Sequence, residues 1–220
     1  MEKAGKRRWG WGLMLAGFAI FYWMLVCTVI DTCGTNAELY SQLQQGNGLP
    51  EAAEITLEEM ETIDQQLAQY LSGDAQVLEE LPFQSHEKLH MEDVFALFEK
   101  LRFARNLLFA AAIVLILSGW LLRREGALRA CLWGLVPAVL PLLLFGIWAA
   151  VDFGGAFTAF HRALFRNDLW QLDAQTDLLL MLCPEGFFRD FAAVIALRTG
   201  MYAMAVPLAL AGIRIGRNFV

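Results

Sequence analysis

Four long apolar runs constrain this 220-residue chain more than any other feature of its sequence. They fall at residues 9–30, 103–122, 130–151 and 191–213. Each run is about 20 residues long, enough for a helix to cross the ~30 Å hydrocarbon core of a bilayer. Hydrophobic residues make up 57% of the chain, which is more apolar surface than a soluble domain can bury. The sequence therefore predicts an all-α membrane protein with four transmembrane helices, forming a single integral membrane domain over residues 1–220.

Basic residues mark one side of this predicted domain. They gather before the first run, between Lys3 and Arg8, in the short turn Arg123–Arg129, and after the fourth run at Arg214 and Arg217. Lys and Arg in short connecting segments favour the cytoplasmic side of a membrane. We therefore predict that the N-terminus and the C-terminus are cytoplasmic, and that the polar segments 31–102 and 152–190 form two extracytoplasmic loops.

The first polar segment contains the pattern of an amphipathic helix. Thr56 and Glu59 have the spacing of a capping box, in which each side chain accepts a hydrogen bond from the other residue's backbone amide. Apolar residues then recur at helical spacing over residues 57–71, and Ser72-Gly73 predicts the end of the helix. Residues 41–50 are rich in Gln, Gly and Asn and are predicted to be a loop.

Two of the three histidines stand close together after that helix. The letters from His86 to His90 spell H-E-x-x-H, a pattern that on a helix can bind zinc and supply a general base through its glutamate. Metalloprotease helices usually keep apolar or uncharged residues where this chain has Lys88 and Glu92. A third ligand would also be required, for which His161 is the best candidate.

A second interpretation pairs His90 with His161, one from each polar segment. Two histidines at a membrane surface can divide proton transfer between them. Asp93 lies one helical turn after His90, where it can orient or electrostatically tune a nearby imidazole. The alternative is that each histidine is a hydrogen-bonded interfacial residue without a catalytic role.

Other chemistry has less support in the sequence. Arg198 falls seven residues into the fourth run, where its charge must reach the interface, pair, or face a cavity that accepts the polar part of a lipid. No G-x-S-x-G elbow, phosphate-binding glycine loop or nucleic-acid-binding patch is present in the sequence. A disulfide between Cys33 and Cys183 is left open.

The order of several short motifs resembles a known family. The segment from His90 to Val94 reads H-M-E-D-V and is similar to the H-M-x-D-V signature of the lipoprotein intramolecular transacylases, called Lit. The second polar segment adds Phe160-His161, Asn167-Asp168 and Trp170 in a similar order. The four spans and two polar segments also agree, so the resemblance covers nearly the whole chain. His86 is not part of the signature.

The resemblance implies an acyltransferase of the bacterial cytoplasmic membrane with an outward-facing active site and no cofactor or metal. Members move the sn-2 acyl chain of an S-diacylglyceryl cysteine to that cysteine's own α-amine, which gives a lyso-form lipoprotein. The implied partners are a diacylated lipoprotein and membrane lipid, without nucleic acid. A zinc metalloprotease and a non-enzymatic membrane scaffold remain the alternatives. The predicted roles are catalytic for His90 and His161, supporting for Asp93, Asn167 and Asp168, and substrate-binding for Arg198 and Trp170.

Overall fold

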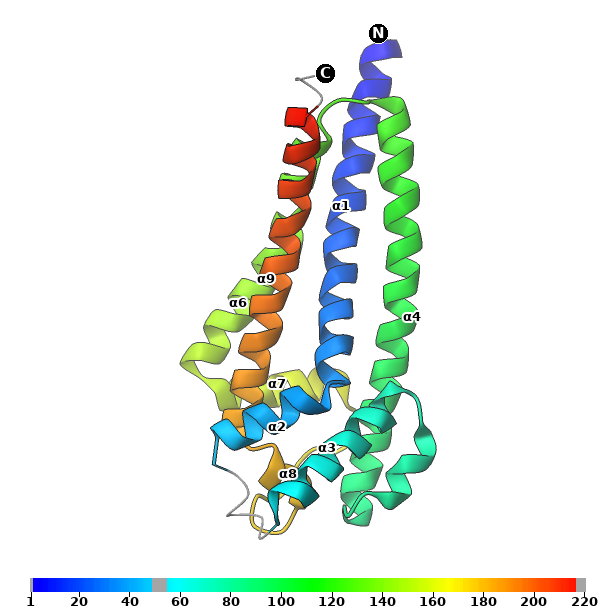
Figure 1. Cartoon of the computed structure of the whole chain (residues 1–220). Helices are drawn as coiled ribbons and strands as arrows, with labels where there is room; N and C mark the ends of the chain where they lie inside the picture. Colours follow the sequence, from blue (N-terminus) through cyan, green and yellow to red (C-terminus); the bar gives the residue numbers. More distant parts are fainter. Residues whose placement is uncertain (1, 49–54, 217–220) are drawn as a thin grey trace. The chain divides into compact units, whose positions relative to one another are not determined.

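The structure is a computed structural model that describes residues 2–48 and 55–216 (Figure 1). The secondary structure of these residues is entirely helical. Arg217, predicted to lie at the cytoplasmic end of the fourth span, is outside the described residues. The helices are α1 (Glu2–Gly34), α2 (Ala37–Gly46), α3 (Leu57–Ser72), η1 (Ala75–Glu80), α4 (Ser85–Leu122), α5 (Ala127–Gly134), α6 (Val136–Val151), α7 (Phe153–Leu164), α8 (Leu178–Leu182) and α9 (Glu185–Gly216).

Four stretches of helix are long and apolar enough to cross a membrane, which confirms the prediction of a four-span protein. They are α1, α4, the pair α5–α6, and α9. The helices extend beyond the predicted runs, and α4 is 38 residues long although about 20 residues suffice for a span. Its first 18 residues, 85–102, carry most of its charged residues, so the membrane-spanning part of α4 is the apolar run 103–122. His86 and His90 lie before that part.

The third span is interrupted near its start. Helix α5 ends at Gly134 and α6 begins at Val136, one residue before Pro137. A proline lacks the backbone N–H and disfavours helical geometry in the residue before it, which accounts for a break at this position. Pro141 is accommodated inside α6.

The described residues form two compact units. The first lies within Met1–Val29, Arg102–Phe145 and Ala196–Val220. In it, α1 and α4 run side by side in close contact (Figure 1), because a Cβ atom added to Gly119 would lie 2.6 Å from the carbonyl oxygen of Gly10. Small residues allow such backbone approach between membrane helices, where apolar burial alone gives little driving force.

The second unit comprises Ile30–Leu101 and Gly146–Ile195 and has its own apolar core. The capping box of α3 is present as predicted: Glu59 N–H donates to Thr56 Oγ1 (3.2 Å), and Thr56 N–H donates to the Glu59 carboxylate (2.8 Å). The apolar face of α3 is buried against η1, α8 and the first turns of α4 and α9. The core includes Met60, Ile63, Leu67, Tyr70, Leu71, Val77, Leu81, Met91, Leu182 and Phe187.

The predicted loop at residues 41–50 is wrong for its first six residues, which belong to α2. Asn36 begins this helix by accepting the N–H of Leu39 (2.9 Å). The polar residues that suggested a loop are used on the inner face of the helix, where Ser41 and Gln44 donate to the buried Asp64 carboxylate (2.7 and 3.0 Å). Residues 49 and 50 lie outside the described part of the chain.

The second polar segment, 152–190, is also more helical than its composition suggested. It contains α7 and α8, and α9 begins within it at Glu185. Asp152 begins α7 by accepting the N–H of Gly155 (2.9 Å). Cys33 and Cys183, whose pairing the sequence left open, are both buried as free thiols. The second unit therefore contains all three histidines, with His86 and His90 on α4 and His161 on α7.

Candidate active site

His90 and His161, which the sequence placed in different polar segments, lie close together in the second unit. His90 is on the second turn of α4 and His161 is near the end of α7, and their ring centroids are 6.4 Å apart. Only 7% of His90 and 8% of His161 is exposed. Two buried imidazoles at this separation can contact the same reacting group.

Aromatic rings surround the pair. The His161 ring lies 4.0 Å from the Phe157 ring and 5.1 Å from the Trp170 ring, measured between centroids. Phe165 contacts both imidazoles, at 5.2 Å from His90 and 5.7 Å from His161. These rings exclude water from the two histidines and offer apolar surface next to them.

A backbone contact determines the tautomer of His161. Its Nδ1 lies 2.8 Å from the carbonyl oxygen of Phe157, one turn earlier on α7. A carbonyl can only accept a hydrogen bond, so Nδ1 carries the hydrogen and Nε2 of the neutral ring holds the lone pair. His161 is thus arranged as a proton acceptor at Nε2. In contrast, Nδ1 of His90 is buried without a hydrogen-bond partner among the described residues.

Burial keeps both imidazoles neutral. For His90, burial is the main cause that lowers the pKa to about 4; His161 lowers it further, and the charge of Asp93 partly opposes the shift. Burial also lowers the pKa of His161 from its ordinary 6.5, against the opposing effect of the Phe157 carbonyl. At neutral pH each ring therefore offers one N–H donor and one lone pair.

Two of the predicted supporting residues, Asp93 and Asn167, are hydrogen-bonded to each other, whereas Asp168 bonds to a residue that follows it in the chain. Asn167 Nδ2 donates to Asp93 Oδ2 (2.8 Å), and Asn167 Oδ1 accepts the N–H of Leu169 (3.2 Å). Asp168 accepts from the side chain of Gln171 (2.8 Å). One N–H of the Asn167 side-chain amide is therefore engaged by Asp93. These contacts fasten the segment after α7 to α4.

The H-E-x-x-H letters do not form one site. Nε2 of His86 lies 3.0 Å from Oδ2 of Asp177, and the fully buried carboxylate of Glu87 accepts the backbone N–H groups of Gln84 and Leu179, both at 2.7 Å. Neither the His86 nor the Glu87 side chain is hydrogen-bonded to His90. Within residues 2–48 and 55–216, no three potential metal ligands gather at one point.

The two predicted substrate-binding residues fall in different units. Trp170 packs on His161, in the second unit. Arg198 is half-buried on α9 and belongs to the first unit. Contact with substrate remains a prediction for both residues.

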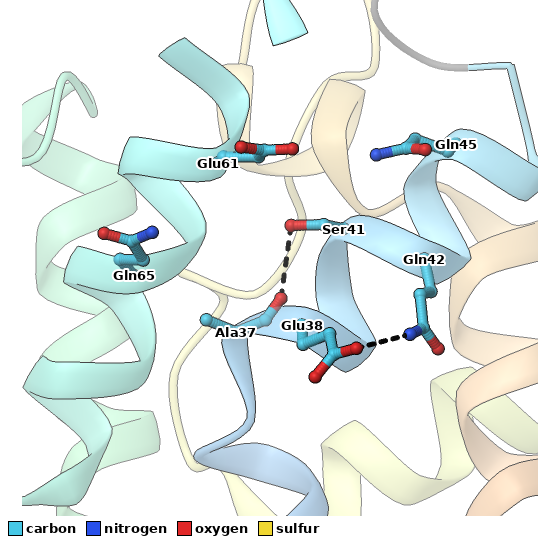
Figure 2. Close-up of a pocket in the computed structure, with 7 residues that line it drawn as sticks. All are labelled: Ala37, Glu38, Ser41, Gln42, Gln45, Glu61 and Gln65. Atoms are coloured by element: carbon cyan, nitrogen blue, oxygen red, sulfur yellow. Dashed lines mark hydrogen bonds between the residues drawn. The ribbon is translucent and has the colours of Figure 1, made fainter. Parts of the chain in front are cut away.

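A separate hollow of about 460 Å³ lies between α2 and α3 (Figure 2). Figure 2 shows its polar walls, with Gln42 donating to Glu38 (3.1 Å) and Ser41 to the Ala37 carbonyl (3.2 Å). Its lining residues include no histidine and, apart from Ala37, all have polar or charged side chains, so it does not suit an acyl chain.

Two contacts near the histidines were not predicted from the sequence. Phe157 acts through its backbone carbonyl, and the only sequence signal is its position four residues before His161 on a helix. Glu87 was considered only as part of a zinc motif. Its position three residues after Gln84, just inside α4, is that of the glutamate in a capping box and would have predicted the bond to the Gln84 amide.

Comparisons with known proteins agree with the fold. A family model described as "Lipoprotein intramolecular transacylase Lit" matches residues 14–188. The fold is similar to the solved membrane-integral lipoprotein intramolecular transacylase Lit from Bacillus cereus, with a TM-score of 0.78 and 20% identity over 98% of each chain. A histidine-to-alanine variant of that protein gives a TM-score of 0.76 and 20% identity, over 98% of this chain and 96% of that one. No curated protein sequence matches the chain.

Proposed function

The chain belongs to the lipoprotein intramolecular transacylase family, and from this premise we propose that it moves the sn-2 acyl chain of an S-diacylglyceryl cysteine to that cysteine's α-amine. The substrate is the N-terminus of a diacylated lipoprotein in the bilayer, and the product is the lyso-form lipoprotein. No cofactor takes part. The protein is a multi-pass membrane enzyme, an acyltransferase.

One observation carries the proposal: His90 and His161 are buried together, and the Phe157 carbonyl fixes His161 as a proton acceptor at Nε2. An ester becomes an amide when an amine attacks the carbonyl carbon and loses a proton. The departing glyceryl oxygen must then gain a proton. A neutral imidazole with an accessible lone pair can perform both transfers in turn.

In the proposed reaction the α-amine nitrogen attacks the carbonyl carbon of the sn-2 ester. His161 Nε2 takes the proton from this nitrogen and becomes an imidazolium, which the Phe157 carbonyl stabilises through Nδ1–H. The bond between the carbonyl carbon and the sn-2 oxygen then breaks, and His161 returns the proton to that oxygen. The acyl group ends on nitrogen, the glyceryl 2-hydroxyl is free, and no net proton is released.

His90 has a different role in this proposal. Its pKa of about 4 makes an imidazolium scarce at neutral pH, so His90 is a poor proton donor to the leaving oxygen. As a neutral ring it can instead donate a hydrogen bond to the oxyanion that forms on the ester carbonyl. Its buried Nδ1 has no partner among the described residues and suits this task. A cationic His90 at neutral pH would require a much higher pKa.

We place the active site on the outer face of the membrane, because the basic segments Lys3–Arg8 and Arg123–Arg129 are predicted to be cytoplasmic. His90 precedes the second span and His161 follows the third span. Both therefore belong to the ends of these spans that are opposite the basic segments. The α-amine and ester of a lipoprotein anchored in the outer leaflet would then meet His90 and His161 at the interface. Glu92 is exposed, so the thiol of a Glu92→Cys variant should react with an impermeant reagent added outside the cell.

The function is tested with purified protein in detergent and a synthetic S-diacylglyceryl-cysteine peptide. We expect conversion to the N-acyl-S-monoacylglyceryl peptide, which has the same mass as the substrate. Fragmentation in a mass spectrometer locates the acyl chain on the amine. Addition of a chelator should leave the rate unchanged, because the proposed chemistry uses only imidazoles. Recovery of the substrate intact, or of a hydrolysed fatty acid, would contradict the proposal.

The rate should rise with pH and should not fall again up to about pH 9. Burial lowers the pKa of His161, so kcat first rises through a pKa below 6.5 as His161 loses its proton. The substrate's α-amine, with a pKa of about 8, adds a second rise. The measurement is kcat against pH at saturating peptide. A fall between about pH 6 and 8 would indicate an obligatory imidazolium and would contradict the neutral role of His90.

A further inference from the structure

We propose that Glu87 is a positioning residue for transacylation. Its buried carboxylate fastens the start of α8, and with it the segment that precedes α8, to the first turn of α4, and this sets how His161 faces His90. The inference rests on the proposed function, since its main readout is the rate of acyl transfer. The hydrogen bonds of Glu87 go to backbone amides and not to either imidazole.

The contacts of Glu87 link two helices. Its side chain is 0% exposed and lies three residues before His90 on α4. Oε2 accepts the N–H of Gln84, the residue that precedes α4, and Oε1 accepts the N–H of Leu179 in the first turn of α8. Both distances are 2.7 Å, as expected for charge-assisted hydrogen bonds. A buried carboxylate held only by backbone amides is costly to move, because each amide would lose its partner.

Two neighbours of Glu87 grip the same segment. Gln84 Nε2 donates to the carbonyl oxygen of Thr176 (2.7 Å), and Nε2 of His86 lies 3.0 Å from Oδ2 of Asp177. We call Gln84, His86 and Glu87 the α4 clamp. Asp177 is 3% exposed and also accepts from the Asp173 amide (2.8 Å). Burial acts to raise the pKa of Asp177, but its hydrogen bonds outweigh that effect and lower the pKa. The side chain that accepts from the clamp is therefore a charged carboxylate.

The segment that the clamp holds also reaches the active site. Its other end is tied to α4 by the bond from Asn167 to Asp93 (2.8 Å). Between these two attachments, Trp170 packs on the His161 ring at 5.1 Å. The segment thus bridges two points on α4, one on either side of His90 in sequence, and carries one wall of His161 between them. Loss of the clamp would free one end of that bridge.

This arrangement explains why the effect should appear in kcat. A displacement of about 1 Å between reacting groups can cost about 100-fold in rate. Glu87 does not contact the substrate in the proposal, so binding of the acyl chains should change little. A mutation that leaves KM unchanged and lowers kcat removes an interaction that matters only in the transition state.

The test compares Glu87→Gln and Glu87→Met with wild type, using the synthetic diacylglyceryl peptide. Gln keeps one acceptor oxygen and Met keeps none at similar volume. We expect kcat to fall about 10-fold for Gln and about 100-fold for Met, with KM changed less than about threefold. Hydrogen–deuterium exchange of the peptide covering residues 173–182 should accelerate in the same order. A role in packing alone would make the two variants equivalent.

Glu92→Gln is the matched control, because it removes the same charge from an exposed position on the same helix. It should keep the wild-type kcat and exchange rate. If kcat of both Glu87 variants stays within about twofold of wild type while residues 173–182 exchange faster, the inference is overturned. If the Glu87 variants fail to fold, the His86→Ala variant replaces them, because His86 is half-exposed. Its kcat must then also fall, by a smaller factor than expected for the Glu87 variants. Absence of product from the wild type would instead refute the proposed function, whereas the exchange result would still report on the clamp.

Discussion

His161→Ala should lower kcat for the diacylglyceryl peptide by about 10²- to 10⁴-fold, the usual range for loss of a general base. The reason is that Nε2 of His161 is the lone pair oriented for proton transfer by the Phe157 carbonyl. KM should stay within a few fold, since the imidazole handles a proton rather than the acyl chains. The rate is measured by mass spectrometry of the peptide product.

His161→Gln separates the base from a hydrogen-bonding role. An amide fills part of the same space and can donate or accept a hydrogen bond, but it cannot take a proton. It should therefore be as inactive as alanine, and added imidazole should partly restore the alanine variant. A glutamine variant with near wild-type kcat would refute the assignment of His161 as the base. Thermal unfolding in detergent checks that both variants are folded.

His90→Phe should lower kcat by about 10²- to 10³-fold, as expected when one oxyanion donor is lost. Phenylalanine keeps a planar ring against Phe165 and removes both nitrogens. The buried Nδ1, which has no partner among the described residues, is removed at no hydrogen-bonding cost to the resting enzyme. The variant should therefore be at least as stable as wild type, in spite of its lost activity.

His90→Gln provides the opposite control to His161→Gln. A neutral amide can donate to an oxyanion, so glutamine at position 90 should retain more activity than phenylalanine. The two histidines thus predict crossed results: glutamine rescues partly at position 90 and not at position 161. If glutamine fails equally at both positions, His90 must itself transfer a proton, and the neutral-donor role is wrong.

The membrane fold was predictable because each span is a local property of the sequence. Length and hydropathy alone identify runs such as 130–151, and the capping box at Thr56 is written in four consecutive residues. Helix α2 was missed because the Gly, Asn and Pro residues at the end of 41–50 masked the helix preference of the Gln and Leu residues before them. Asp64, which comes 23 residues after Ser41 and 20 residues after Gln44, contributes to the stability of α2 by accepting hydrogen bonds from both side chains. Local patterns contain no information on such a partner.

For the candidate site too, some features could be predicted from the sequence and others could not. The pairing of His90 with His161 could be inferred from motif order, although their catalytic roles remain predictions. The separation of His86 from His90 could not, because it depends on Asp177, which comes 91 residues after His86 in the chain. The letters H-E-x-x-H are compatible with a metal site on any helix, and only the tertiary neighbours of Glu87 show that its carboxylate is already occupied.

The group that orients His161 is a main-chain carbonyl and not a side chain. Every amino acid at position 157 supplies the same oxygen, so substitutions there can reshape the aromatic wall without altering which imidazole nitrogen carries hydrogen. The backbone of α7 therefore determines which nitrogen of His161 accepts a proton. This leaves the surface around the base free to diversify towards acyl chains of different length and shape while the proton-transfer geometry is preserved.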